Sequence, residues 1–214
     1  MAGATGGGKE TAVVRYGKPL VFVLCLLPLA LLSWRIAAGR LGANPVEAVL
    51  HFTGAWGLRL LLVTLAVTPL RRLTGRGWLL RFRRMLGLFA FFYVVLHVAV
   101  YLVLDRSLAW EEIVTDLSKR PYIMVGFAAF VLLVPLAVTS TRGWVRRLGR
   151  RWQLLHRSVY LIAVLGVLHF LWLVKADLRE PLIYAAVLAA LLAMRVPWPR
   201  LSGDRRGLGA GRLQ

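Results

Sequence analysis

The four histidines are the residues of this sequence best suited to binding a metal ion or a redox cofactor. They are His51, His97, His156 and His169, and each lies in or beside an apolar stretch rather than in a polar tail. An imidazole at membrane depth is costly unless it binds a ligand or forms a hydrogen bond across a helix interface. One such histidine is as well explained by a helix-bridging role as by a ligand role, but several together favour a bound group.

The expected depths of two histidines match. His97 precedes Asp105 by eight residues, and His169 precedes Lys175 by six. At a helical rise of 1.5 Å per residue, the two imidazoles lie about 12 and 9 Å below the same end of two spans. Neutral imidazoles can ligate haem iron from opposite sides. This arrangement predicts a haem between the third and fifth spans, held by His97 and His169.

His156 precedes His169 by thirteen residues, which puts it about 20 Å away along a helix and excludes it from the same iron. It predicts a second site near the other end of the spans. The matching position on the third span holds Arg83 and Arg84 instead of a histidine. The second site therefore uses another ligand or binds another group. Arginines beside a histidine can hold quinone oxygens or haem propionates, but they also fit simple topology and headgroup contact.

His51 begins the second span within the stretch HFTG. It could compete as a ligand at the His97 site, but we expect it to cap the helix or to contact a cofactor from the side. The single cysteine, Cys25, excludes a disulfide within the chain and argues against a thiolate metal site. The candidate metal ligands are therefore His97, His156 and His169. The other candidate cofactor-binding residues are Arg83, Arg84 and His51.

The composition indicates a multi-pass membrane protein. The chain has 214 residues, of which 59% are hydrophobic, and its mean hydropathy is +0.68. The net charge of +19 could suggest nucleic acid. However, the basic residues fall between apolar runs rather than on one soluble face, so the expected partner is the lipid bilayer and not nucleic acid.

Six apolar stretches come close to the ~20 residues that a membrane helix needs. They are Pro19–Ala38, Pro45–Leu70, Met85–Leu104, Tyr122–Ser140, Trp152–Val174 and Pro181–Val196. Lysine and arginine gather in alternate connections, whereas most acids lie in the others. Because basic loops stay in the cytoplasm, this pattern predicts an all-α, six-helix bundle with both termini cytoplasmic.

The expected organisation has three parts. Residues 1–18 form a flexible cytoplasmic N-terminus, residues 19–198 form the transmembrane domain, and residues 199–214 form a cytoplasmic tail. The first apolar run could instead be a signal peptide, since basic residues precede it and small residues follow it. No internal repeat is evident in the sequence.

The stretches around these residues resemble a known family. They include LGANPVEAVLHFTG, RFRRMLGL, LHVAVY, RPYIMVG, RRLGRRWQLLHRSVYL and LHFLWLVKAD. The chain is similar to the haem-binding membrane subunit of the protein-methionine-sulfoxide reductase system (MsrQ/YedZ), within the ferric-reductase-like transmembrane superfamily. The similarity covers the region from about Leu41 to Trp198.

The resemblance implies b-type haem, one or two per chain, with His97, His156 and His169 at the family's haem-associated positions. It implies a bacterial inner-membrane protein that passes electrons from membrane quinol to a periplasmic, molybdopterin-containing methionine-sulfoxide reductase. FMN is also associated with the family, although no FMN motif is visible here. The paired arginines, which replace a fourth histidine, leave the number of haems open.

About 18 residues follow the last expected span, which is too few for a nucleotide-binding domain. We therefore expect electrons to come from quinol or from a separate cytoplasmic flavin reductase, and we expect no complete catalytic site in this chain. Two alternatives remain. One is a stand-alone haem-dependent reductase of ferric chelates or other small acceptors. The other is a transporter or assembly protein whose histidines only bridge helices, although no acid lies within the apolar cores.

Overall fold

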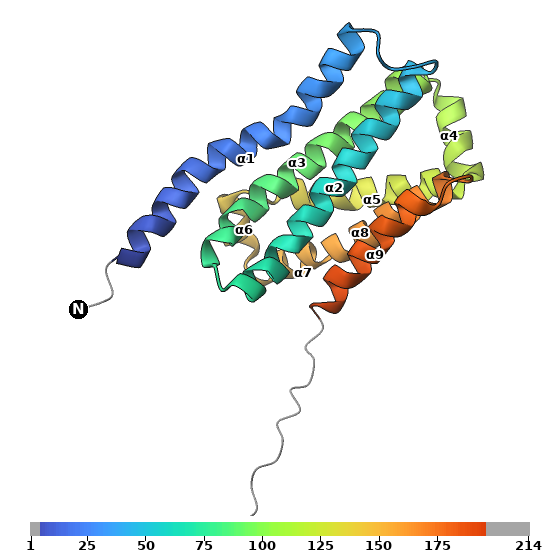
Figure 1. The fold of residues 1–214 in the computed structure, drawn as a ribbon. Helices are drawn as coiled ribbons and strands as arrows, with labels where there is room; N and C mark the ends of the chain where they lie inside the picture. The colour runs from blue at the N-terminus through green and yellow to red at the C-terminus, as the bar shows by residue number, and fades with distance from the viewer. Residues whose placement is uncertain (1–4, 196–214) are drawn as a thin grey trace, which may run out of the picture.

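The computed structural model describes residues 5–195, and throughout this range the regular structure is helical (Figure 1). The longer helices are α1 (Thr5–Ala37), α2 (Pro45–Thr74), α3 (Leu80–Val100), α5 (Pro121–Val138), α8 (Val159–Leu173) and α9 (Arg179–Ala193). The shorter elements are η1 (Gly77–Leu79), η2 (Tyr101–Asp105), α4 (Trp110–Lys119), α6 (Arg142–Leu148) and α7 (Arg150–Arg157).

Within residues 5–195, five helical segments are long and apolar enough to cross a membrane, so the chain is a multi-pass membrane protein. They are Ala12–Ala37, Pro45–Thr74, Gly77–Asp105, Pro121–Val138 and Arg150–Leu173. At the sixth predicted span, α9 has 15 helical residues, and Val196 lies outside the described part of the chain, as does the tail 199–214. Helix α1 begins at Thr5, well before Pro19, so residues 5–18 are helical where the sequence predicts a flexible segment.

The start of α2 shows how local sequence determines a helix boundary. Asn44 precedes the helix and its side chain accepts a hydrogen bond from the Glu47 backbone N–H at 3.3 Å. The Asn44 amide donates in return to the Glu47 carboxylate at 2.9 Å. Pro45 occupies the first helical position, where the helix does not need the backbone N–H that proline lacks. The cap of α2 is therefore Asn44, and the expectation that His51 caps this helix is wrong.

The bundle is built from two pairs of packed helices. Helix α2 packs along α3, and α5 packs along α8 (Figure 1). Gly57 allows the first close approach, because a methyl group there would lie 2.8 Å from a Val94 side-chain carbon. The buried centre includes Leu65, Ala90 and Ala163, which are all fully inaccessible. This packing brings His97 on α3 and His169 on α8 into contact with each other.

The fifth predicted span, Trp152–Val174, is not one continuous helix. It is divided into α7 and α8 at Ser158, whose hydroxyl donates to the Leu155 carbonyl at 2.7 Å. His156 and His169 therefore lie on opposite sides of a helix break. The ideal-helix angle of ~220° between them, from 100° per residue, consequently does not apply.

Tyr93 attaches α1 to α3 beside Pro28, which lies inside α1. Its hydroxyl donates to the Cys25 carbonyl at 2.8 Å and accepts from the Leu29 backbone N–H at 3.1 Å. These two backbone groups are one helical turn apart, next to a residue that has no N–H to donate. The fully buried Tyr93 side chain therefore bridges two main-chain groups of α1.

We expect Tyr93→Phe to loosen α1 without unfolding the bundle. The change leaves two buried backbone groups without their bridge, which costs about 1–3 kcal/mol. Thermal unfolding in detergent should show a lower midpoint, and Cys25, now buried, should react faster with N-ethylmaleimide. Tyr16→Phe is the control, since Tyr16 is 72% exposed. Unchanged labelling of Cys25 would contradict this assignment.

Candidate functional site

His97 and His169 face each other across the bundle. Their ring centroids are 6.2 Å apart and their planes are inclined by 76°. Nδ1 of His97 lies 2.9 Å from the carbonyl oxygen of Leu50, and Nδ1 of His169 lies 2.7 Å from that of Tyr122. A carbonyl can only accept, so each Nδ1 carries the proton. Each neutral ring therefore has its lone pair on Nε2, which is the arrangement of a metal-ligating histidine.

A glycine on the neighbouring helix makes room for each imidazole. A methyl group at Gly54 would lie 2.9 Å from Nδ1 of His97, and one at Gly126 would lie 2.6 Å from Nδ1 of His169. Both glycines come four residues after the residue whose carbonyl accepts the bond. A helical carbonyl points toward the residue four positions on, so a side chain there would cover it. Glycine leaves the carbonyl open to the ring.

The two histidines are held by the same local arrangement. Both are separated by 47 residues from the carbonyl that they contact, and both have the glycine at the same spacing. The pairs α2–α3 and α5–α8 therefore present imidazoles in equivalent ways. The sequence shows no internal repeat, and the structure shows that the two helix pairs nevertheless share their histidine-binding geometry.

Both histidines line a cavity of about 710 Å³, which we call the histidine-pair cavity. This volume is within the range of cofactor sites. Most of its wall is apolar, from α2, α3, α5 and α8. The polar residues of the wall include His51, Arg59, Asp105, Arg106, Arg120 and Glu180. His51 thus lies beside the cavity, as expected for a lateral contact.

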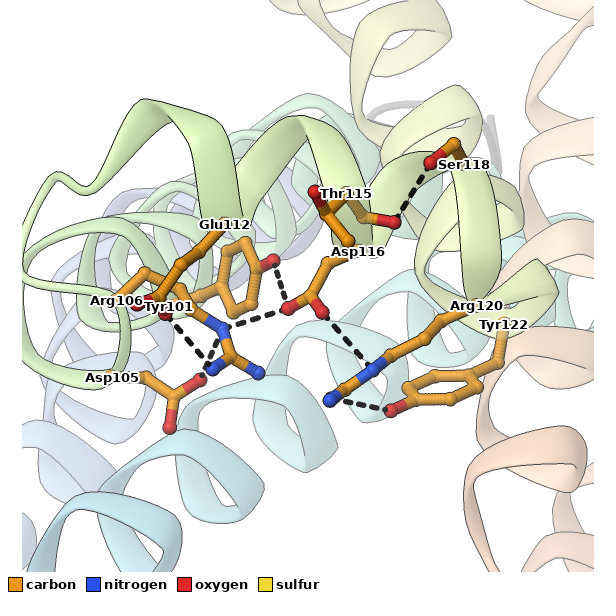
Figure 2. Close-up of polar contacts among 9 residues, drawn as sticks. All are labelled: Tyr101, Asp105, Arg106, Glu112, Thr115, Asp116, Ser118, Arg120 and Tyr122. Atoms are coloured by element: carbon orange, nitrogen blue, oxygen red, sulfur yellow. Dashed lines mark hydrogen bonds and ion pairs between the residues drawn. The ribbon is translucent and has the colours of Figure 1, made fainter.

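Helix α4 lies at one end of the bundle and is anchored through a buried carboxylate (Figure 2). Asp116 pairs with Arg106 at 2.7 Å and with Arg120 at 3.0 Å, and the Tyr101 hydroxyl donates to it at 3.0 Å. The segment that leads into α4 has positive φ at Ser107 and Leu108, which is uncommon for residues other than glycine. The Asp116 network holds this strained turn beside the cavity, since both arginines line the cavity wall.

His156 lines a second cavity of about 670 Å³, the His156 cavity, together with Arg83, Arg84 and Arg142. The ring stacks on Trp152 with centroids 3.8 Å apart, and its Nδ1 lies 3.1 Å from the Trp152 carbonyl oxygen. Nε2 is buried and has no hydrogen-bond partner within residues 5–195. Such an atom is costly unless a ligand satisfies it.

The structure thus brings the predicted residues together in two groups. His97, His169 and His51 line one cavity, and His156, Arg83 and Arg84 line the other. A stacked pair of rings, Phe91 and Phe130, has centroids 6.5 Å apart. Phe130 lines the first cavity and Phe91 lines the second. These stacked side chains therefore form part of the wall between the two cavities.

Sequence reasoning missed several residues around the histidine-pair cavity. The sequence alone did not mark Gly54 and Gly126. Their importance follows from their position four residues after Leu50 and Tyr122, whose carbonyls contact the histidines. Arg59 was detectable as a charge in the interior of the second apolar stretch, and the structure pairs it with Glu180. Asp116 gave no signal, because its burial results from the turn at Ser107 and Leu108.

These features define a helical membrane protein with one pair of imidazoles presented to a cavity. The family model described as "Ferric reductase like transmembrane component" matches residues 53–167, which include His97 and His156. Two similar relatives are protein-methionine-sulfoxide reductase heme-binding subunits MsrQ. The one from Xanthomonas axonopodis pv. citri is 54% identical over 200 residues, covering 91% of each chain. The one from Rhodospirillum rubrum is 57% identical over 193 residues, covering 90% of this chain and 93% of the relative. The chain therefore belongs to the ferric-reductase-like transmembrane family and, within it, to the group of MsrQ haem-binding subunits.

We expect Asp116→Asn to release α4. The substitution leaves Arg106 and Arg120 beside a neutral side chain, and removing one partner of a buried ion pair costs on the order of 3 kcal/mol. Limited proteolysis should cut the turn between Arg106 and Trp110 faster than in the wild type. Glu112→Gln is the matched control, since Glu112 lies 3.7 Å from Arg106 and its side chain is 64% exposed. Equal cleavage of both variants would refute the anchoring role of Asp116.

Proposed function

We propose that this chain is a membrane b-type cytochrome that passes electrons from the respiratory quinone pool to a periplasmic, molybdopterin-containing methionine-sulfoxide reductase. The partner would repair oxidised proteins of the envelope. The observation that carries the proposal is the facing pair His97 and His169, whose Nε2 lone pairs are directed by main-chain hydrogen bonds. Close relatives named as haem-binding subunits support it.

The histidine pair fits haem as judged from its own geometry. Two imidazoles on opposite sides of one metal have centroids about 6 Å apart, because bonds of ~2 Å add to each ring's radius. The observed separation is 6.2 Å. Haem bound there supplies a one-electron Fe(III)/Fe(II) couple. The chain's contribution is to fix the imidazole tautomers, exclude water with the apolar wall and hold the rings against Gly54 and Gly126.

The His156 cavity is the proposed entry point for electrons. Its orphaned Nε2 can ligate a second haem or bind a quinone oxygen. Arg83 is partly buried and close enough to His156 to act on it electrostatically, whereas Arg84 is exposed. Arg83 is therefore the arginine that we assign to the cavity. In this proposal, electrons pass from the His156 cavity to the histidine-pair cavity across the stacked rings of Phe91 and Phe130.

The proposed topology has six spans with both termini cytoplasmic, so that the His156 cavity faces the cytoplasm and α4 faces the periplasm. Residues Asp105–Arg120 and Lys175–Glu180 then form the surface available to the reductase. FMN and a cytoplasmic flavin reductase belong to the proposal through the family resemblance. If they take part, the arginine-rich end beside His156 is where we expect reducing equivalents to arrive.

We expect His97→Ala and His169→Ala each to remove the haem of the histidine-pair cavity. Purified protein from haem-replete cells should lose the corresponding part of its Soret band and its low-spin signature. Gly126→Ala should weaken the same haem, since the added methyl group would meet Nδ1 of His169 at 2.6 Å. Gly143→Ala is the control, because its methyl group meets only the Thr141 hydroxyl at 3.9 Å and Gly143 lines neither cavity. A full haem spectrum in both histidine variants would refute the ligand assignment.

We expect His156→Ala and Arg83→Ala to act on electron entry. A pyridine haemochrome assay on the wild type and His156→Ala gives the number of haems that depend on His156. Arg83→Ala should slow reduction by quinol at least several-fold while leaving the histidine-pair haem in place. Arg84→Ala should have a smaller effect, because Arg84 is the exposed member of the pair. Unchanged quinol reduction in Arg83→Ala would contradict this entry route.

A further inference from the structure

A charged residue lies in the middle of the second span. Arg59 follows the first residue of α2 by fourteen positions, about 21 Å along the helix. Its Nε donates to the Tyr184 hydroxyl at 2.6 Å and its Nη2 donates to the Glu180 carboxylate at 3.1 Å. The guanidinium also lies over the Trp56 ring, 5.2 Å from its centroid. Charges within spans are costly and generally have a functional role.

This charge pair belongs to the histidine-pair cavity. Arg59 and Glu180 both line it. Tyr184 packs edge-on against Phe170, the residue next to His169, with centroids 5.7 Å apart. On the other side, Arg59 follows Gly54, which contacts His97, by five residues or about 7.5 Å of helix. The guanidinium thus lies on the wall of the cavity that both imidazoles line.

Attachment of α9 to α2 does not by itself explain a guanidinium this far along α2. The other end of α9 is joined to α2 through main-chain carbonyls, because Arg72 donates to that of Met194 and Arg195 donates to that of Leu65. A partly exposed ion pair contributes about 0–1 kcal/mol to stability, whereas placing charges in a span is costly. The pair therefore calls for a role at the cavity itself.

We propose that Arg59, held by Glu180 and Tyr184, positions a carboxylate of the cofactor bound by His97 and His169 and sets the reduction potential of that cofactor. The inference rests on the proposed function. A guanidinium has five N–H donors, and the contacts to Tyr184 and Glu180 use two of them. The remaining edge can bind a propionate in the bidentate manner that carboxylates favour.

The sign of the electrostatic effect follows from charge alone. The oxidised cofactor carries one more positive charge than the reduced cofactor. The Arg59 cation therefore destabilises the oxidised form and raises the midpoint potential, whereas the Glu180 anion lowers it. Since the wall is mostly apolar, these interactions are weakly screened. Removing the Arg59 charge must then lower the midpoint potential, and removing the Glu180 charge must raise it.

The test is an optical redox titration of the purified, haem-loaded wild type and variants. We expect Arg59→Gln to lower the midpoint of the histidine-pair haem and Glu180→Gln to raise it. The double variant should return toward the wild type, and Arg59→Lys should retain most of the wild-type potential. Tyr184→Phe removes a hydrogen bond without changing a charge. Arg72→Gln removes a charge from the same helix away from the cavity, so it should leave the potential unchanged.

The outcomes separate this inference from a purely structural role. Loss of thermal stability in Arg59→Gln and Glu180→Gln without opposite shifts in potential would overturn it. If Arg59→Gln fails to hold haem, a raised midpoint in Glu180→Gln supports the inference and an unchanged one overturns it. A wild type without any Soret band would refute the proposed function itself, and this inference with it. A bis-histidine spectrum with equal midpoints in all variants would overturn this inference alone.

Discussion

The structure depends on one requirement: an imidazole inside a membrane must keep Nε2 free while its Nδ1 proton is satisfied. A helical carbonyl already accepts one hydrogen bond from within its helix, but its oxygen has a second lone pair. Leu50 and Tyr122 offer this lone pair to His97 and His169. The oxygen is accessible only where the residue four positions on lacks a side chain. The site therefore consists of a carbonyl and a glycine as much as of a histidine.

This requirement explains the architecture of two paired helices. Each histidine needs a partner helix at close range, so α2 must pack on α3 and α5 on α8. Repeating the same arrangement across the bundle places two Nε2 atoms on opposite sides of one cavity. The equivalence ends at the other cavity, where the His156 ring stacks on Trp152 and α3 contributes Arg83. The two helix pairs thus share a geometry at the histidine-pair cavity and differ at the His156 cavity.

The sequence predicts the parts of the site that depend on helix rise alone. Matching depths of His97 and His169 follow from counting residues to the ends of two spans, as does the separation of His156. The carbonyl partners and glycines depend on contacts between residues 47 positions apart, which no local pattern specifies. The break at Ser158 has no proline or glycine to announce it. Helix α4 was missed because its polar sequence lacks the apolar run on which the span assignment was based.

The charges around the histidine-pair cavity show how the bundle tolerates polarity at depth. Asp116 is flanked by Arg106 and Arg120, and Arg59 by Glu180, so each buried or half-buried charge has an opposite partner. Neither pair is satisfied within one helix; each joins an element at the cavity rim to a neighbour. A bound group that carries its own charge would therefore interact with residues that also hold α4 and α9 in place. Binding of such a group would then be coupled, through the same side chains, to the packing of α4 and α9.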